Sequence, residues 1–380
     1  MSLFFITFFT LYGLIHLYAF LKAKAAFSLN AQQSIPVILF MAVMTFAPAI
    51  IRYLERFGFE FFARTMSYIG YLWMGVLILF FSLAVCLDIY RLLIYLGHFI
   101  VSRDVSALSP PVKISFFLPV LFALAAAGYG FFEAQNIRLE HITVKTSRIP
   151  EEISRFRIVQ ISDVHLGLIV RENRLKKILS KVREAYPDLL VCTGDLVDGQ
   201  INNLEGLAEI LRGIHPAYGK FAITGNHEYY AGLHQSLAFI KKSGFTILRG
   251  QSVDINGIIT LAGVDDPTGR QFNGSMGNTE QEVLSGLDRE KFTILLKHRP
   301  LIDMNSLGLF DLQLSGHTHK GQIFPFSLVT KLYYPRHAGY LSLPGRSHLY
   351  TSRGSGTWGP PIRFLSPPEV TVIDLVREEE

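Results

Sequence analysis

The sequence has few charged residues and almost no cysteine. Of its 380 residues, 18% are Asp, Glu, Lys or Arg and 49% are hydrophobic, and the mean hydropathy is +0.30. Soluble domains carry about 25% charged residues, so this composition favours a membrane protein. The two cysteines, Cys86 and Cys192, lie in apolar runs, and we interpret both as buried reduced thiols that act as small apolar residues. They do not identify the cellular compartment.

The sequence also lacks any cluster of Lys and Arg, although its pI is about 9.0. The formal net charge of +5 is spread thinly, since residues 1–136 carry 8 basic and 5 acidic residues and residues 137–380 carry 28 and 26. Without a basic run or a basic helix face, we expect no nucleic-acid partner. A mildly basic surface that faces anionic lipid fits the same charge.

Charged residues are absent from four long stretches: Ser2–Leu21, Ile35–Ile51, Met66–Leu87 and Ile114–Phe132. A helix needs roughly 20 apolar residues to cross about 30 Å of hydrocarbon, and lipid forces the backbone to satisfy its own hydrogen bonds. We therefore predict an N-terminal transmembrane bundle of about four helices in residues 1–136. The second stretch is short and contains Pro36 and Pro48, and a buried core helix is the alternative for any single stretch. The absence of Asp, Glu, Lys and Arg within the stretches disfavours a transporter.

Basic residues near these stretches give conflicting information on orientation. No basic segment precedes the first stretch, which is also long, and both features disfavour a cleaved signal peptide. Lys22 and Lys24 follow the first stretch, so the positive-inside rule places that loop in the cytoplasm, and four spans then place the C-terminal domain outside it. In that arrangement Arg52, Arg56 and Arg64 lie on the outer side and oppose the assignment.

From Ile137 onward, short β-rich runs alternate with amphipathic helical patterns. Apolar residues recur at helical spacing in Arg171–Tyr186, and further helices are predicted at Leu204–Leu211 and Leu233–Lys242. This alternation, with more β structure later, predicts an α/β domain over residues 137–380 in which helices cover the sheets. The predicted strands are Phe156–Ser162, Asp188–Thr193, Lys220–Thr224, Ile258–Gly263, Phe292–Lys297, Asp311–Ser315, His348–Ser352 and Val370–Leu375.

Side chains that bind metals follow five of these strands, at the sheet edge where ligands collect in α/β folds. Taken singly, each has a structural interpretation, such as a helix N-cap for Asp163 or a turn for Asp195 or Asn226. Five such strand ends in one domain indicate instead that the groups converge, because uncompensated buried carboxylates and imidazoles are costly. The candidates are Asp163 and His165; Asp195 and Asp198; Asn226, His227 and Glu228; His298; and His317 and His319.

Carboxylates, an amide oxygen and several imidazoles form a mixed oxygen and nitrogen set, which suits Mn, Fe, Zn or similar ions. One ion needs roughly four to six ligands, so the number of candidates suggests two divalent or trivalent ions with a bridging carboxylate. Two ions about 3.5–4 Å apart hold a hydroxide and stabilise both the attacking and the leaving oxygen of a phosphoryl displacement. His227, beside Asn226, would remain free to donate a proton to the leaving oxygen.

The order of these motifs resembles the calcineurin-like metallophosphoesterase family. The resemblance runs from Arg155 to Leu375 and rests on five blocks in order, D-x-H, G-D, G-N-H, H and G-H-x-H. It implies a four-layer α/β/β/α sandwich, a dinuclear metal centre bridged by Asp195, and a phosphate-contacting acid role for His227. The implied ligands of the first metal are Asp163, His165, Asp195 and His319, and those of the second are Asp195, Asn226, His298 and His317.

Two later segments, SRGSGTWGPPIRF and SPPEVTVIDL, resemble a membrane-associated bacterial subgroup of this family. That subgroup includes enzymes of the UDP-2,3-diacylglucosamine hydrolase type and related phosphodiesterases, which implies a multi-pass protein of a bacterial inner membrane. Lys320 stands where the subgroup commonly has Gly, and it either contacts an anionic substrate or is simply solvated. The aromatic-rich segment Phe324–His337 is either an insertion over the sheet edge or an interfacial lip near the metals.

We therefore expect a membrane-embedded hydrolase that cleaves a phosphodiester or pyrophosphate bond with a metal-bridging hydroxide. The spans favour a lipid-linked or envelope substrate, because an enzyme held in a bilayer meets lipids at high effective concentration. A membrane-tethered phosphodiesterase for soluble nucleotides or phosphodiesters is the alternative. A non-catalytic scaffold with the same fold is a further alternative, which the complete set of candidate ligands disfavours. The sequence leaves the native metals and the oligomeric state open.

Overall fold

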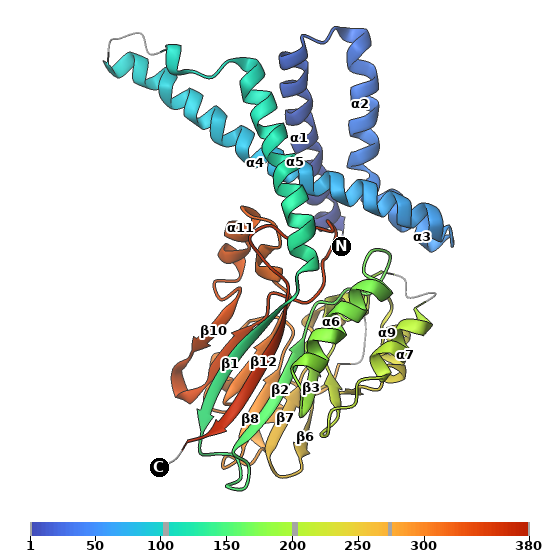
Figure 1. Cartoon of the computed structure of the whole chain (residues 1–380), viewed down its shortest axis with the longest axis vertical. Helices are drawn as coiled ribbons and strands as arrows, with labels where there is room; N and C mark the ends of the chain where they lie inside the picture. Colours follow the sequence, from blue (N-terminus) through green and yellow to red (C-terminus); the bar gives the residue numbers. More distant parts are fainter. Residues whose placement is uncertain (1, 102–105, 200–203, 273–275, 379–380) are drawn as a thin grey trace. The chain divides into compact units, whose positions relative to one another are not determined.

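The computed structural model describes residues 2–101, 106–199, 204–272 and 276–378 (Figure 1). The chain separates into two compact units. The helical unit comprises Met1–Phe132 with Gly359–Phe364, and the larger unit comprises Glu133–Trp358 with Leu365–Glu380. The predicted boundary after residue 136 lies close to the first break, but the sequence did not indicate that a short segment near the C-terminus groups with the N-terminal helices.

Long apolar helices make up the helical unit. Among the described residues, three helices are long and apolar enough to span a membrane, or four if one bent pair counts as a single span. The three are α1 (Ser2–Phe27), α4 (Glu60–Val101) and α5 (Val112–Gln135). This composition, together with the length of the helices, identifies a membrane protein.

The bent pair replaces the single second span that the sequence predicted. Helix α2 (Ala31–Thr45) ends at Phe46, and α3 (Ala47–Arg56) leaves at an angle of 54°. Pro48 lies at the start of α3. A proline there has no N–H to give to the preceding turn and disfavours the helical conformation of the residue before it, so α2 and α3 do not form one straight helix.

The helices extend beyond the charge-free stretches and therefore contain ionisable residues. Lys22 of α1 forms an ion pair with Asp88 of α4, and the hydroxyl of Tyr18 donates to Asp88 Oδ2 at 2.7 Å. Closer to the middle of the same helices, Trp73 Nε1 donates to His16 Nε2 at 3.0 Å. Each of these polar groups has a partner inside the helical unit, as low-dielectric surroundings require.

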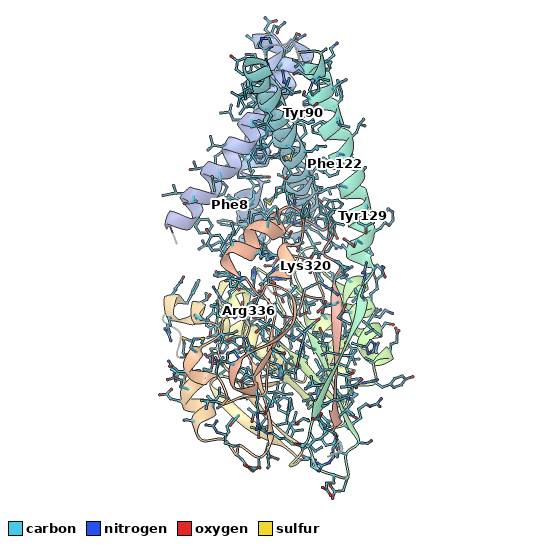
Figure 2. The ribbon with its side chains drawn as sticks, turned by 90° about the vertical axis from the view of Figure 1, so that its left-hand side faces the viewer. Phe8, Tyr90, Phe122, Tyr129, Lys320 and Arg336 are labelled. Carbon is cyan, nitrogen blue, oxygen red and sulfur yellow. The ribbon has the colours of Figure 1, made fainter. Side chains whose placement is uncertain are left out.

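The segment Gly359–Phe364 packs within the helical unit. The amide of Arg363 donates to the carbonyl of Gly130 in α5 at 2.9 Å, and the ring of Phe364 makes edge contacts with Phe122 and Tyr129, both labelled in Figure 2. A Cβ atom at Gly75 in α4 would lie 2.7 Å from Cδ1 of Ile362. The glycines therefore admit the segment by leaving space for its backbone and its isoleucine.

Two six-stranded mixed sheets form the centre of the larger unit. The order in the first sheet is β1 (Arg138–Thr146), β12 (Glu369–Arg377), β2 (Arg155–Ile161), β3 (Leu189–Cys192), β4 (Lys220–Ala222), β5 (Thr246–Ile247). The order in the second is β10 (Gly339–Ser342), β11 (His348–Thr351), β9 (Leu312–Ser315), β8 (Phe292–Leu296), β7 (Ile259–Gly263), β6 (Gln251–Ile255). Strands β2 to β5 run parallel to one another, and so do β7, β8, β9 and β11.

Helices cover the outer faces of both sheets, which completes the four-layer α/β/β/α arrangement. Helices α6 (Glu172–Glu184), α7 (Glu205–Arg212) and α9 (Leu233–Lys242) cover the first sheet (Figure 1). The short α10 (Glu280–Ser285) packs on the second sheet beside β7. The remaining helices of this unit, α8 (Asn226–Tyr230) and α11 (Phe326–Tyr333), follow β4 and β9. The predicted fold class is confirmed.

Alternating side chains in the central strands face two different cores. In β3, Leu189 and Val191 face the core between the sheets, whereas Leu190 and Cys192 face the core beneath the helices. Both faces are apolar because a parallel strand is covered on both sides. Cys192 is thus buried as predicted. The prediction was wrong for Cys86, which is exposed on α4, because an apolar residue of a lipid-facing helix needs no burial within the protein.

Candidate metal centre

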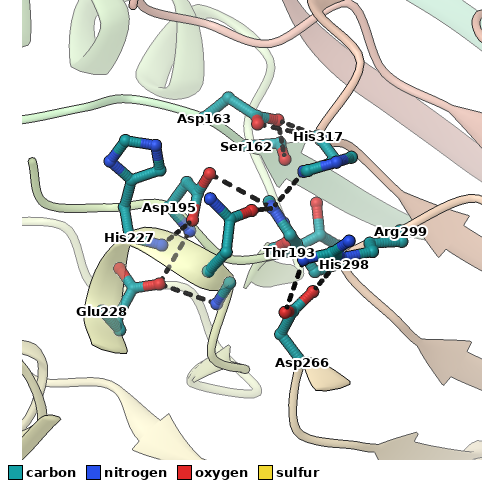
Figure 3. Close-up of polar contacts among 12 residues, drawn as sticks. Ser162, Asp163, Thr193, Asp195, His227, Glu228, Asp266, His298, Arg299 and His317 are labelled. Atoms are coloured by element: carbon teal, nitrogen blue, oxygen red, sulfur yellow. Dashed lines mark hydrogen bonds and ion pairs between the residues drawn. The ribbon is translucent and has the colours of Figure 1, made fainter. Parts of the chain in front are cut away.

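All the predicted site residues lie together at the carboxyl ends of five strands. Figure 3 labels six of them: Asp163, Asp195, His227, Glu228, His298 and His317. Strands β2, β3 and β4 of the first sheet and β8 and β9 of the second end at a common edge, and the turns that follow them carry the polar side chains. The seven predicted ligands fall into two groups that meet at Asp195.

Asp163, His165 and His319 form the first group. The Nε2 atoms of His165 and His319 lie 3.1 Å apart, and Nε2 of His319 lies 3.6 Å from Oδ1 of Asp163. The carboxylate of Asp163 is held from behind, since the amide of His317 donates to it at 2.9 Å and the hydroxyl of Ser162 donates at 2.5 Å.

Asp195, Asn226, His298 and His317 form the second group. Nε2 of His298 is at its centre, 3.2 Å from Oδ2 of Asp195, 3.2 Å from Oδ1 of Asn226 and 3.2 Å from Nδ1 of His317. The same Oδ2 of Asp195 lies 3.8 Å from Nε2 of His165 in the first group. One carboxylate oxygen therefore faces both groups.

These separations fit ligands that surround a common ion. Two atoms each about 2.1 Å from a metal ion, at a right angle, lie about 3 Å from each other. His298 and His317 are also oriented as metal ligands are, with one nitrogen towards the centre and the other held outside it. Nδ1 of His298 lies 2.7 Å from the carbonyl of Thr193, and Nε2 of His317 lies 3.0 Å from the hydroxyl of Tyr334.

The electrostatics of the two groups point to the same conclusion. Burial lowers the pKa of His165 to about 4 and that of His317 to about 3, so both imidazoles are neutral and keep the lone pair that a metal needs. Burial also lowers the pKa of His298, but Asp195 and Asp163 outweigh it and raise the pKa to about 10. The carboxylates thus require a positive charge at this point, which a metal ion supplies as well as a proton does.

The backbone is strained where it presents these side chains. Left-handed φ angles, which non-glycine residues seldom adopt, occur at Asp163 (51°), His165 (54°), Asp195 (52°), His317 (72°) and His319 (49°). Neighbouring glycines allow the turns to approach one another. A Cβ at Gly225 would lie 2.2 Å from Oδ1 of Asp195, and one at Gly316 would lie 1.9 Å from Oγ of Ser162.

His227 lies beside the two groups and has a partner of its own. Its amide donates to Oδ1 of Asp195 at 2.8 Å, and its Nδ1 lies 2.8 Å from Oδ1 of Asp198. Burial lowers the pKa of His227, but Asp195 and Asp198 outweigh burial and raise it to about 9. The imidazole is therefore protonated near neutral pH. Asp198 was a candidate without a predicted role, although its position three residues after Asp195 is visible in the sequence.

Comparisons with known proteins agree with this geometry. Residues 156–321 match the model of calcineurin-like phosphoesterases. An uncharacterized metallophosphoesterase of Aquifex aeolicus is 40% identical over 257 residues, which cover 67% of this chain and 98% of that protein. This chain belongs to the calcineurin-like phosphoesterase family. The predicted family is thus confirmed, and the protein is a metal-dependent phosphoester hydrolase.

Two further similarities complete the comparison. A Danio rerio protein named transmembrane protein with metallophosphoesterase domain is 31% identical to this phosphoesterase over 315 residues, which cover 76% of this chain and 72% of that protein. The solved structure of a 5'-nucleotidase precursor from Thermus thermophilus matches with a TM-score of 0.34 and 16% identity. That match covers 58% of this chain and 54% of the other.

Glu228 supports the turns of this phosphoesterase from below. Its carboxylate, labelled in Figure 3, accepts hydrogen bonds from the amides of Asp195 at 3.0 Å and Gly225 at 2.7 Å. It also accepts one from the amide of Leu196 at 2.8 Å. The amides of Asp195 and Leu196 follow β3 and that of Gly225 follows β4, so one carboxylate joins the turn of the shared Asp195 to the turn of Asn226. Glu228 was a candidate without a predicted role because this link exists only between two strands.

A second set of polar residues borders the group around His298. Arg299 donates to Asp266 through Nε at 2.8 Å and to Thr268 through NH2 at 2.8 Å. Its guanidinium also interacts with Tyr334, whose hydroxyl contacts His317. None of these residues was among the predicted candidates. Tyr334 belongs to the segment Phe324–His337, whose structure the sequence left open.

Lys320 adopts a left-handed conformation, with φ of 52° and ψ of 31°. Glycine takes this conformation without a steric penalty and is therefore suited to this position. Lysine adopts it at a cost in conformational free energy. The side chain is half-buried.

Proposed function

We propose that this phosphoesterase is embedded in a membrane and hydrolyses a phosphodiester or pyrophosphate bond of a lipid-linked or envelope substrate at a two-metal centre. The observation that carries the two-metal centre is the position of Asp195, whose Oδ2 faces both His165 and His298. Asp163, His165, Asp195 and His319 would hold the first ion, and Asp195, Asn226, His298 and His317 would hold the second.

The bound ions would polarise the phosphoryl group and make a water molecule acidic enough to attack at neutral pH. The residues of the chain do the rest. Asp163 and Asp195 neutralise the ions, and their own oxygens are positioned by the amides of His317 and His227. Protonated His227 donates its Nε2 proton to the leaving oxygen, while Asp198 holds Nδ1 and stabilises the imidazolium.

The apolar helices support a lipid-linked substrate, since they keep the catalytic residues at a membrane. The name of the Danio rerio relative, which joins a transmembrane part to a metallophosphoesterase domain, is consistent with a multi-pass arrangement. We also propose that this membrane is a bacterial inner membrane. Lys22 and Lys24, near the end of α1, favour a cytoplasmic loop after it, and with α2 and α3 counted as one span the catalytic domain would then lie outside the cytoplasm. Arg52, Arg56 and Arg64 oppose this orientation.

Hydrolysis and metal content measured together test this function. Detergent-solubilised protein, loaded with Mn²⁺, is expected to cleave CDP-diacylglycerol, a lipid-linked pyrophosphate, faster than bis(p-nitrophenyl) phosphate. Asp195→Ala removes the shared ligand and is expected to abolish both activities and release bound metal. Full activity of Asp195→Ala would overturn the mechanism, and faster turnover of the soluble diester would overturn the lipid substrate. A topology reporter fused after Glu380 tests the orientation.

A further inference from the structure

Helix α11 (Phe326–Tyr333) is an amphipathic helix with no buried residue. Leu332 is 81% exposed, and the other large apolar side chains of the helix are exposed as well: Phe326, Leu328, Val329 and Tyr333. Phe324, just before the helix, is also exposed. The segment therefore does not pack over the sheet edge, which is one of the two alternatives that the sequence leaves open. A contiguous exposed apolar surface of this kind marks an interaction site.

Both ends of α11 contact the turn that carries two of the site histidines. At its beginning, Ser327 lies so close to Gly321 that a Cβ on the glycine would be 2.3 Å from Cα of Ser327. Just after its end, the hydroxyl of Tyr334 lies 3.0 Å from Nε2 of His317. Contacts at both ends therefore hold the exposed helix at the edge of the metal centre.

Trp358 extends the apolar surface to the catalytic histidine. Its ring is 51% exposed and lies edge-on to the ring of His227, with centroids 5.8 Å apart. Its backbone is held by Gln322, which accepts from the amide of Trp358 and donates to its carbonyl, both at 2.9 Å. Gln322 precedes α11 by four residues, so Trp358 and the helix belong to one surface.

Basic residues accompany this apolar surface. Lys320 precedes α11, Lys331 lies on it, and Arg336 follows it (Figure 2 labels Lys320 and Arg336). Lys331 and Lys320 both lie close enough to His337 to lower its pKa, in addition to the larger effect of burial. Apolar residues next to Lys and Arg are the composition of helices that lie in a membrane interface, where the cations attract anionic headgroups.

We propose that α11 and Trp358, with Lys320, Lys331 and Arg336, form a lip that inserts into the surface of the bilayer. The occupant is bilayer lipid. The apolar side chains enter the acyl region beside the metal centre, and the cations bind headgroup phosphates. Chain order supports this choice, because β1 begins three residues after α5 ends and Trp358 is followed directly by the segment that packs among the helices. The inference rests on the proposed lipid function and deepens it.

Fluorescent labelling of the full chain in nanodiscs tests insertion directly. Leu332→Cys is labelled with an NBD fluorophore in a Cys86→Ser background, since Cys192 is buried. Tyr186→Cys is the matched control, because Tyr186 is 80% exposed and follows α6 at the opposite edge of the sheet. We expect a blue-shifted emission at residue 332 that lipids brominated on the acyl chain quench at least twofold, and neither effect at residue 186. Equal spectra at the two positions without quenching would overturn the lip.

Turnover of a lipid and a soluble substrate distinguishes a role of Leu332 in lipid binding from a role in the metal centre. Leu332→Glu is expected to lower kcat/KM at least tenfold for CDP-diacylglycerol in phosphatidylglycerol vesicles and to leave hydrolysis of bis(p-nitrophenyl) phosphate unchanged, whereas Tyr186→Glu changes neither. An equal loss on both substrates would place Leu332 in the fold or the site and overturn the proposal. If wild-type protein cleaves no lipid while the label at residue 332 is still quenched, the lip stands and the proposed substrate class fails.

Discussion

Replacing Asp198 with Asn tests the proton-donating role of His227 without changing the shape of the site. The asparagine keeps an oxygen that accepts from Nδ1 of His227, now 2.8 Å from Asp198 Oδ1, but removes the negative charge. That charge and the one on Asp195 together overcome burial and raise the pKa of His227 to about 9. The variant therefore isolates the electrostatic contribution of Asp198.

The expected size follows from the pKa of His227. The rise from its ordinary value of 6.5 to about 9 corresponds to a few kcal/mol in favour of the imidazolium. If the two carboxylates contribute equally, Asp198→Asn lowers the pKa of His227 by more than half of this rise, because the two together also outweigh the opposing effect of burial. Metal ions bound at Asp195 would cancel part of its negative charge. Asp198 would then make the larger contribution to the raised pKa of His227 in the metal-loaded enzyme.

The sign of the pH effect is set by the proton. His227 acts as an acid only while protonated, and it loses its proton as the pH rises through its pKa. A lower pKa therefore moves the alkaline limb of the kcat/KM profile of Asp198→Asn to lower pH, by about one pH unit or more. The loss of kcat/KM at high pH should be largest for a diester with an alkyl leaving group, because an alkoxide needs a proton to leave. A p-nitrophenolate leaves without a proton, so hydrolysis of a p-nitrophenyl diester depends little on His227.

The assay is the pH profile of kcat/KM between pH 6 and 10, measured for a diester with an alkyl leaving group and for bis(p-nitrophenyl) phosphate. The metal content is measured in parallel. Asp254→Asn is a suitable control, since its carboxylate is exposed and pairs with Lys291 at the surface. An unmoved alkaline limb in Asp198→Asn, at wild-type metal content, would refute the assignment of His227 as the acid supported by Asp198.

Three further changes have specific expected outcomes. Gly225→Ala places a Cβ 2.2 Å from Oδ1 of Asp195, so we expect a loss of about 1–3 kcal/mol in unfolding free energy together with metal release, measured by denaturation and metal analysis. Tyr334→Phe removes the 3.0 Å contact to Nε2 of His317 and should weaken one of two bound ions by about 10–100-fold in chelator competition, whereas equal weakening of both would contradict the assignment. Lys320→Gly should raise the unfolding free energy by about 1 kcal/mol by relieving the left-handed backbone, and should raise KM for vesicle-borne substrate while sparing a soluble diester.

Local patterns were sufficient to locate the candidate ligands at strand ends and to predict most regular elements. Helix α9 begins at Leu233 and ends at Lys242, as the apolar spacing predicts, and the strands that precede the ligands lie within one or two residues of their predicted bounds. A buried parallel strand is a continuous apolar run, and a ligand that follows it is displayed at the same sheet edge as its neighbours. Short motifs at consecutive strand ends therefore indicate a site from local sequence alone.

These local patterns did not predict the short helices or the exposure of apolar residues. Helix α8 has five residues and α11 has eight, so neither shows enough periodicity to be recognised, and α11 owes its position to contacts at Gly321 and Tyr334. The bend between α2 and α3 was visible in the sequence only as Pro48. Cys86 appeared buried because an apolar neighbourhood does not distinguish a protein core from a lipid-facing surface.

The sequence by itself thus determined which chemistry the protein carries, because the types and order of the ligands are local properties. Only the tertiary structure decided how that chemistry is supported. Asp198 pairs with His227 across 29 residues, Asp195 receives support from Glu228 across 33, and Gly359–Phe364 packs with helices more than two hundred residues earlier. Such partners are brought together by burying apolar surface on both faces of two sheets and between helices, and that process leaves no short-range pattern in the sequence.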